Sequence, residues 1–248
     1  MIRNFYRFNF AVFAAILIAL VSCFPLLGAD GRSEHNAAIT KSQIQKTAAV
    51  QPVKDAVEVQ LEQSGLVNLK NMGADFVYDQ RYGTTNNFTG SRIYNSERVY
   101  LRPATAQKLV DAEKEFNSLG YRIKIWDAYR PYSVQLLLYK KVASDRKYFI
   151  ANPYSKESSV HNRGAAIDIT LVHTDGSAVE MPTDFDTFSY AANINNKNCS
   201  KQAVYDRELL ASVMNKHGFV GIECEWWHFN DSDIVNDPEK YSIVDVMF

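Results

Sequence analysis

The chain has 248 residues, of which 46% are hydrophobic and 12% aromatic, and its formal net charge is −1 at pH 7. This length is enough for one well-buried domain, or for one domain with appendages. The near-zero net charge provides no electrostatic footprint for nucleic acid, so we expect no nucleic-acid partner.

The N-terminus is typical of an export signal. Two arginines precede an apolar stretch at 10–21 that is too short to predict a transmembrane span. A lipobox pattern ends at Cys23 as the acylated residue, whereas 27–29 offers an ordinary cleavage site and a retained anchor is a third alternative. We predict a signal peptide at 1–23 and an exported protein, periplasmic or in the cell envelope, whose only membrane contact is a lipid on Cys23.

Two regions follow the signal. A polar stretch rich in Lys, Gln, Ser, Ala and Glu, without a sustained apolar period, predicts a tether at 24–63. Beyond it, no internal repeat or low-complexity block interrupts the sequence. We therefore predict a single folded domain at 64–248, and its oligomeric state stays open.

The apolar patterns of this domain alternate between helical and strand periods. In chain order we expect a helix from Pro103 to a cap at Gly120, a strand at 121–126, a helix after Pro131 with Val134, Leu136, Leu137 and Val142 on its apolar face, a helix at 206–217, and strands at 219–222 and 226–229. The sequence thus predicts an α+β fold, with a small mixed or antiparallel sheet flanked by helices.

The stretch SSVHNRGAAIDIT at 158–170 places His161 and Asp168 in an apolar run that is typical of a buried strand. Unpaired polar groups are costly in such a strand. The two side chains are therefore either a satisfied structural pair or members of a site, and this stretch alone leaves both alternatives open.

A second informative stretch is EWWH at 225–228. In a regular strand Glu225 and His228 would point to opposite faces, whereas in a tight turn they would share one side. His228 with His161 and Asp168 gives three ligands of the kind that Zn²⁺ takes in catalytic sites, and Glu225 is left as a base. We expect such a site to lie on the sheet.

Two cysteines, Cys199 and Cys224, follow Cys23 in the chain, and they lack a CxxC spacing. We therefore expect no thiolate ligand. Export would place both residues in an oxidising compartment, so a disulfide between them is one alternative and two buried thiols the other.

Five motifs resemble the zinc D-alanyl-D-alanine dipeptidases, the family that includes the enzymes of vancomycin resistance. They occur in the family's order and extend over most of 64–230: DFVYDQRYGTTNNFTG (75–90), WDAYRP (126–131), HNRGAAIDITL (161–171), MPTDFD (181–186) and GFVGIECEWWHF (218–229). The resemblance implies one Zn²⁺ per chain, bound by His161, Asp168 and His228.

The resemblance also implies roles for the other site residues. Glu225 is the general base and acid, and Arg130 stabilises the oxyanion of the tetrahedral intermediate. Asp186 matches the acid that binds the substrate ammonium. Tyr82 and Ser159 match positions that line the same pocket, although a packing or turn role is the equal alternative for both.

The function implied by the resemblance is zinc-dependent hydrolysis of D-alanyl-D-alanine to two D-alanines. One alternative is a peptidoglycan carboxypeptidase or L,D-endopeptidase of the same zinc class, which an open groove in place of a closed pocket would identify. The other is a non-catalytic wall-binding lipoprotein, which would need neither Glu225 nor Arg130.

Overall fold

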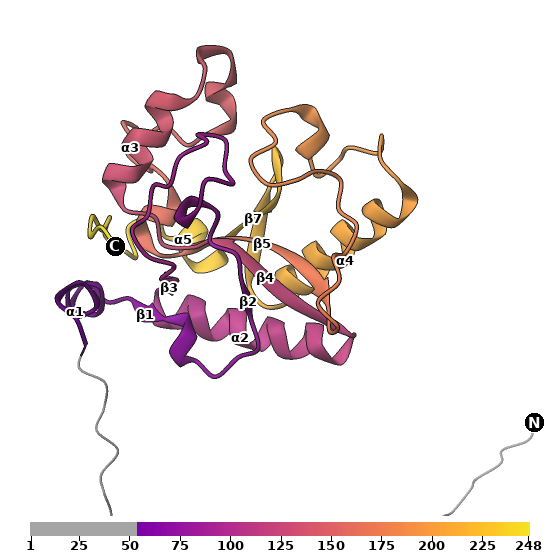
Figure 1. The fold of residues 1–248 in the computed structure, drawn as a ribbon, viewed down its shortest axis with the longest axis horizontal. Helices are drawn as coiled ribbons and strands as arrows, with labels where there is room; N and C mark the ends of the chain where they lie inside the picture. The colour runs from indigo at the N-terminus through magenta and orange to yellow at the C-terminus, as the bar shows by residue number, and fades with distance from the viewer. Residues whose placement is uncertain (1–53) are drawn as a thin grey trace, which may run out of the picture. The chain divides into compact units, whose positions relative to one another are not determined.

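A mixed five-stranded sheet lies at the centre of the protein in a computed structural model that describes residues 54–248 (Figure 1). Strand β2 runs parallel to β4, and all other neighbouring strands are antiparallel. In their order across the sheet the strands are β2 (Val77–Tyr78), β4 (Tyr121–Asp127), β5 (Ala166–His173), β7 (Glu225–Asp231) and β6 (Phe219–Ile222). The predicted α+β fold with a mixed sheet is confirmed.

Short elements surround this sheet. A second, two-stranded sheet pairs β1 (Val67–Asn68) with β3 (Tyr100–Leu101) in antiparallel register. The α-helices are α1 (Ala56–Gln63), α2 (Pro103–Ser118), α3 (Tyr132–Lys141), α4 (Lys201–Lys216) and α5 (Ser232–Asn236). Single turns of 3-10 helix are η1 (Leu69–Asn71), η2 (Arg81–Gly83), η4 (Val160–Arg163) and η5 (Tyr190–Ala192), and η3 (Ser144–Phe149) is longer.

Helices α2 and α4 contact each other and pack against the sheet, α2 on β4 and α4 on β6 and β7 (Figure 1). Helix α2 begins at Pro103, whose fixed backbone angle and missing N–H suit the first helical position. Its Ala106, Leu109 and Phe116 are completely buried, and the chain turns at Gly120 with a φ of 87°. The helix and strand expected here are therefore confirmed.

Two helices differ from their prediction. Helix α4 begins at Lys201 instead of 206, because the Ser200 side chain accepts a hydrogen bond from the Ala203 N–H and caps the helix early. In α3 the ends of the expected apolar face, Val134 and Val142, are buried as predicted, but the middle of that face differs. Leu138 is buried, Leu137 is 38% exposed, and the polar Gln135 takes a buried place on the inner face.

The folded domain also begins before residue 64. Helix α1 occupies the last residues of the predicted tether, and its Leu61 is completely buried in the core. The predicted signal peptide, the acylated Cys23 and the tether up to residue 53 lie outside the described residues. Within 54–248, no helix combines the length and apolar character that a membrane span requires.

On the side of the sheet away from α2, two segments extend beyond the strands: 143–158, which contains η3, and 181–198, which contains η5 (Figure 1). Both segments contribute residues to one pocket at the sheet. The sheet thus supplies the floor of this pocket and the two segments supply its walls.

Candidate functional site

His161 lies on η4 and not, as predicted, on a strand. Asn162 anchors this turn, because its Oδ1 accepts from the Ser158 hydroxyl at 3.0 Å and its Nδ2 donates to the Arg130 carbonyl at 2.8 Å. Gly164 then ends η4 in the left-handed region with a φ of 67°, which favours glycine. Gly164 therefore serves this turn and its close packing against Leu66 and Arg102.

Asp168 and His228 lie on adjacent strands. Asp168 of β5 is the direct antiparallel partner of His228 of β7. A β-bulge interrupts the pairing of β6 with β7, where Ile222 opposes Glu225 but Gly221 opposes Phe229. The extra residues reorient the strand between Glu225 and His228, so that both side chains line the same pocket.

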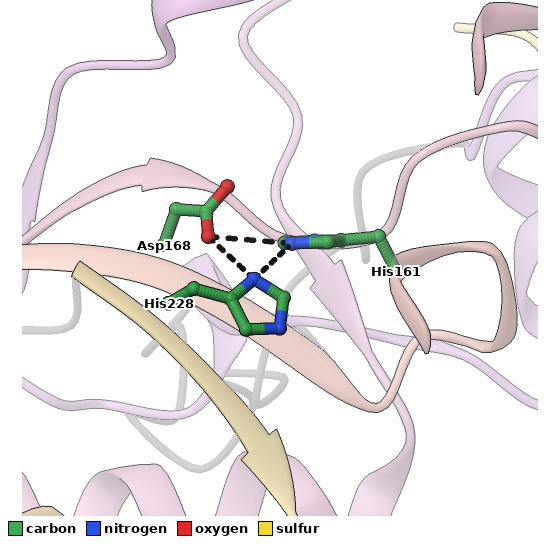
Figure 2. A group of neighbouring side chains, drawn as sticks. All are labelled: His161, Asp168 and His228. Carbon is green, nitrogen blue, oxygen red and sulfur yellow. Dashed lines mark hydrogen bonds and ion pairs between the residues drawn. The ribbon is translucent and has the colours of Figure 1, made fainter. Parts of the chain in front are cut away.

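The three predicted ligands converge in a buried cluster, as Figure 2 shows. His228 Nδ1 lies 3.0 Å from Asp168 Oδ1 and 3.1 Å from His161 Nε2, and His161 Nε2 lies 3.3 Å from Asp168 Oδ1. Burial opposes ionisation of Asp168, but the two imidazoles hold the pKa of this carboxyl well below its usual range.

The outer nitrogens of both rings have acceptors of their own. His161 Nδ1 lies 2.6 Å from the Ala128 carbonyl oxygen, and His228 Nε2 lies 2.8 Å from Asn230 Oδ1. In the neutral form of each ring the outer nitrogen would hold the proton and donate it to this acceptor, which would leave His161 Nε2 and His228 Nδ1 as lone pairs facing a carboxylate oxygen. Three acceptors directed at one point suit a cation, and two imidazoles with one carboxylate suit Zn²⁺.

Glu225 lies beside this cluster, with its Oε2 3.9 Å from His228 Nδ1 and its side chain 15% exposed. Burial, reinforced by the nearby Asp168 charge and opposed by His228, raises the pKa of Glu225 to about 7. A carboxyl group with a pKa near neutrality is suited to exchanging a proton with a substrate.

Arg130 follows the end of β4 and lines the same pocket. Its Nη2 lies 2.8 Å from Asp127 Oδ2 and 3.5 Å from Asp168 Oδ2. Burial alone would lower the pKa of Arg130, but the Asp127 carboxylate beside it raises that pKa well above its ordinary value. The guanidinium is therefore a fixed positive charge next to the cluster.

Asp186 and Tyr82 form another part of the pocket. The Tyr82 hydroxyl lies 3.1 and 3.2 Å from the two carboxylate oxygens of Asp186. Burial, with the charge of Glu225 added, raises the pKa of Asp186 well above its ordinary range. Asp186 also has a φ of 56°, a strained conformation for a residue other than glycine.

The pocket that these residues line has a volume of about 280 Å³. Ser159 lines it beside His161. Tyr148 and Phe149 of η3 and Phe188 of the 181–198 segment form its walls, and the rings of Phe149 and Phe188 stack with centroids 6.2 Å apart. All the predicted ligand, catalytic and substrate-binding residues therefore meet at one pocket.

Comparison with known proteins identifies the family of the chain. A family model described as D-ala-D-ala dipeptidase matches residues 62–246. The chain belongs to the D-Ala-D-Ala dipeptidase family. The resemblance seen in the sequence is thereby confirmed, and the chain is a peptidase of a metallopeptidase family.

Two dipeptidases of this family are each about 30% identical in sequence to this chain. The D-alanyl-D-alanine dipeptidase of Enterococcus faecalis is 29% identical over 71% of this chain and 94% of its own length. That of Escherichia coli is 32% identical over 66% of this chain and 83% of its own length. The solved structure of a vancomycin resistance D,D-dipeptidase with a D-Ala-D-Ala phosphinate analogue has a TM-score of 0.35 at 19% identity, over 58% of this chain and 57% of that one.

The structure also brings residues to the site that the sequence analysis did not single out. Asp127 contacts Arg130, and Asn230 contacts His228. Asn230 stands two residues after His228, so the strand period of two already places both on one face. Asp127 could have been found from its place in WDAYRP, where it is a carboxylate three residues before Arg130.

The two cysteines are free thiols in the structure, with no disulfide between them. Cys199 precedes α4, and its Sγ lies 4.0 Å from the Asn196 carbonyl oxygen. Cys224 lines the pocket beside Glu225, and burial raises the pKa of its thiol to about 11. Each thiol is thus half-buried in separate surroundings, which corresponds to the alternative of two unpaired thiols.

Proposed function

We propose that this chain is a zinc-dependent D,D-dipeptidase that hydrolyses D-alanyl-D-alanine to two D-alanines. The observation that carries the proposal is the convergence of two imidazoles and one carboxylate on a single point, beside a base and a guanidinium in the same pocket. His161, Asp168 and His228 would hold one Zn²⁺ per chain, which when bound would polarise the scissile carbonyl and activate a water molecule.

Glu225 and Arg130 would carry out the remaining steps at the scissile bond. The Glu225 carboxylate takes a proton from the attacking water and later passes it to the departing amine. The Arg130 guanidinium faces the oxygen on which negative charge develops. A fixed cation in that position contributes a factor on the order of 10² to 10³ in rate.

Asp186 would bind the free amino group of the substrate. The raised pKa of Asp186 favours its neutral form in the empty pocket. A substrate ammonium beside it would stabilise the carboxylate instead, and the Tyr82 hydroxyl already donates to that carboxylate. Binding a positively charged amine therefore relieves the cost of burying Asp186.

The size of the pocket supports a dipeptide over a longer peptidoglycan stem. Its volume of about 280 Å³ lies just below the range of roughly 300–1,000 Å³ that is usual for ligand sites. The stacked rings of Phe149 and Phe188 link the two walls. A carboxypeptidase or endopeptidase would need an open path for the rest of its substrate at this place.

The test is a substrate panel combined with one variant. The wild-type protein should release D-alanine from D-Ala-D-Ala, and only slowly from L-Ala-D-Ala and from an N-acetylated tripeptide ending in D-Ala-D-Ala. Glu225→Ala should nearly abolish hydrolysis yet retain one zinc per chain, because it removes a base and no ligand. Loss of zinc from Glu225→Ala, or preferred cleavage of the tripeptide, would contradict the proposal.

A further inference from the structure

Asp127 is the last residue of β4 and is completely buried, although the hydrolytic steps assign it no role. Its Oδ2 accepts a hydrogen bond from Arg130 Nε at 2.9 Å and forms an ion pair with Arg130 Nη2 at 2.8 Å. Its Oδ1 accepts a hydrogen bond from the Tyr94 hydroxyl at 3.0 Å. A buried carboxylate with this many donors has one fixed orientation.

Nearly all donors of Arg130 are accounted for by its neighbours. A guanidinium has five N–H groups. Those of Nε and Nη2 reach Asp127 and Asp168, and Nη1 donates to Gln135 Oε1 at 2.8 Å. One N–H of Nη1 thus has no partner among residues 54–248. Arg130 lines the pocket, so a bound substrate can approach its guanidinium.

The Tyr82 ring and Gln135 restrict the guanidinium further. The Arg130 guanidinium carbon lies 5.3 Å from the centre of the Tyr82 ring. Gln135 is itself held by its Nε2, which donates to the Ala151 carbonyl oxygen at 2.8 Å. The plane of the guanidinium is therefore defined on several sides, and Asp127 supplies the one carboxylate that contacts it through two nitrogens.

We infer that Asp127 is a positioning residue for the reaction. It directs the Arg130 guanidinium toward the oxyanion and holds it there when bound substrate has displaced water from the pocket. This inference rests on the proposed function. A buried guanidinium without a counter-charge is costly and would move toward water or toward the metal ligand Asp168. The Asp127 carboxylate prevents both movements, so that the free N–H of Nη1 faces the substrate before the reaction begins.

The first test is Asp127→Asn, which has nearly the same shape but lacks the charge and presents an amide to the Arg130 donors. We expect kcat for D-Ala-D-Ala to fall about 10- to 100-fold while KM changes by less than about threefold, since the aimed donor acts on the transition state. Zinc content should stay at the wild-type value. A phosphinate analogue of D-Ala-D-Ala should bind about 10- to 100-fold more weakly, because its anionic tetrahedral centre needs the same donor.

A double-mutant cycle separates positioning from a general loss of structure. If Asp127 acts through Arg130, then Asp127→Asn should slow an Arg130→Ala enzyme by less than about twofold. Equal losses in both backgrounds would overturn the inference. Glu113→Gln is the matched control, because Glu113 is another buried acidic residue and lies on α2, away from the pocket. The kcat of this control variant should equal the wild-type value.

Arg130→Lys keeps the inference testable if Asp127→Asn does not fold. Lysine retains the positive charge but cannot bond Asp127 through two nitrogens. Its kcat should fall about 10- to 100-fold, and a wild-type kcat would overturn the inference. Wild-type turnover of D-Ala-D-Ala tests the proposed function separately, and the same ratios can be measured on any substrate of the panel. A protein inactive on every substrate would overturn both.

Discussion

Gly164→Ala is expected to destabilise the turn that carries His161. Gly164 has a φ of 67°, and a Cβ built on it would collide with Leu66 Cδ2 and lie 3.5 Å from the Arg102 backbone nitrogen. The left-handed conformation costs alanine roughly 1–2 kcal/mol, and overpacking against the buried Leu66 adds about 1–3 kcal/mol. The free energy of unfolding should therefore fall by about 2–5 kcal/mol.

Two comparison variants separate these contributions in urea unfolding. Gly120 also has a positive φ, 87°, but nothing lies within 4 Å of its added Cβ, so Gly120→Ala should cost only about 1–2 kcal/mol. Leu66→Ala removes the colliding atom. The double variant Leu66→Ala/Gly164→Ala should therefore be about 1–3 kcal/mol more stable than the sum of the two single losses predicts.

Equal losses for Gly164→Ala and Gly120→Ala, or strict additivity with Leu66→Ala, would refute the collision with Leu66. Zinc affinity provides an independent measurement at the site. A displaced η4 turn moves His161, so Gly164→Ala should bind zinc about tenfold more weakly, while Gly120→Ala should not.

Three further changes give separate expectations. Asp186→Ala should impair hydrolysis of free dipeptides far more than that of N-blocked peptides in kcat/KM assays, and equal losses would remove its ammonium role. Phe188→Ala removes the ring stacked on Phe149, so cleavage of the N-acetylated tripeptide should rise relative to D-Ala-D-Ala; an unchanged ratio would show that this wall does not limit substrate length. Burial raises the pKa of Glu113 from 4.5 to about 7, so the folded state holds its proton longer than the unfolded state, and stability falls as the pH rises from about 4.5 through 7. Glu113→Gln should remove this loss, about 3 kcal/mol by pH 8, in urea unfolding at pH 5 and 8.

The regular elements were predictable because their signals are local. Pro103 and Gly120 bracket α2, and the buried Ile123 and Ile125 alternate along β4, so short-range periodicity was sufficient. The start of α4 was missed because the buried face of its first two turns carries the polar Asp206 and Arg207 beside the small Ala203, and only the Ser200 cap marks the start. Periodicity indicates an apolar buried face, but it does not locate a helix end whose buried face is polar.

The identities of the site residues were predictable, whereas their geometry was not. The sequence left open whether Glu225 and His228 share a side, because a strand period of two separates residues three apart. The β-bulge opposite Gly221 and Ile222 decides this in the structure, and it depends on pairing with another strand. The contact of Asp127 with Arg130 likewise needs the turn at the end of β4 to close, which no pattern in the sequence specifies.

The charges of the site explain why a free amine matters to the proposed substrate. Among the described residues of the site, the carboxyl groups of Asp127, Asp168, Asp186 and Glu225 accompany a single guanidinium, that of Arg130. The acids raise one another's pKa, as Glu225 does for Asp186 and Asp168 does for Glu225. A divalent cation at the histidines and an ammonium at Asp186 would, together with the Arg130 guanidinium, balance the four carboxylates, so that all of them could be ionised at once. An N-acylated peptide brings no such charge. It would leave Asp186 either protonated or unpaired, and this electrostatic cost adds to the steric limit set by the pocket walls.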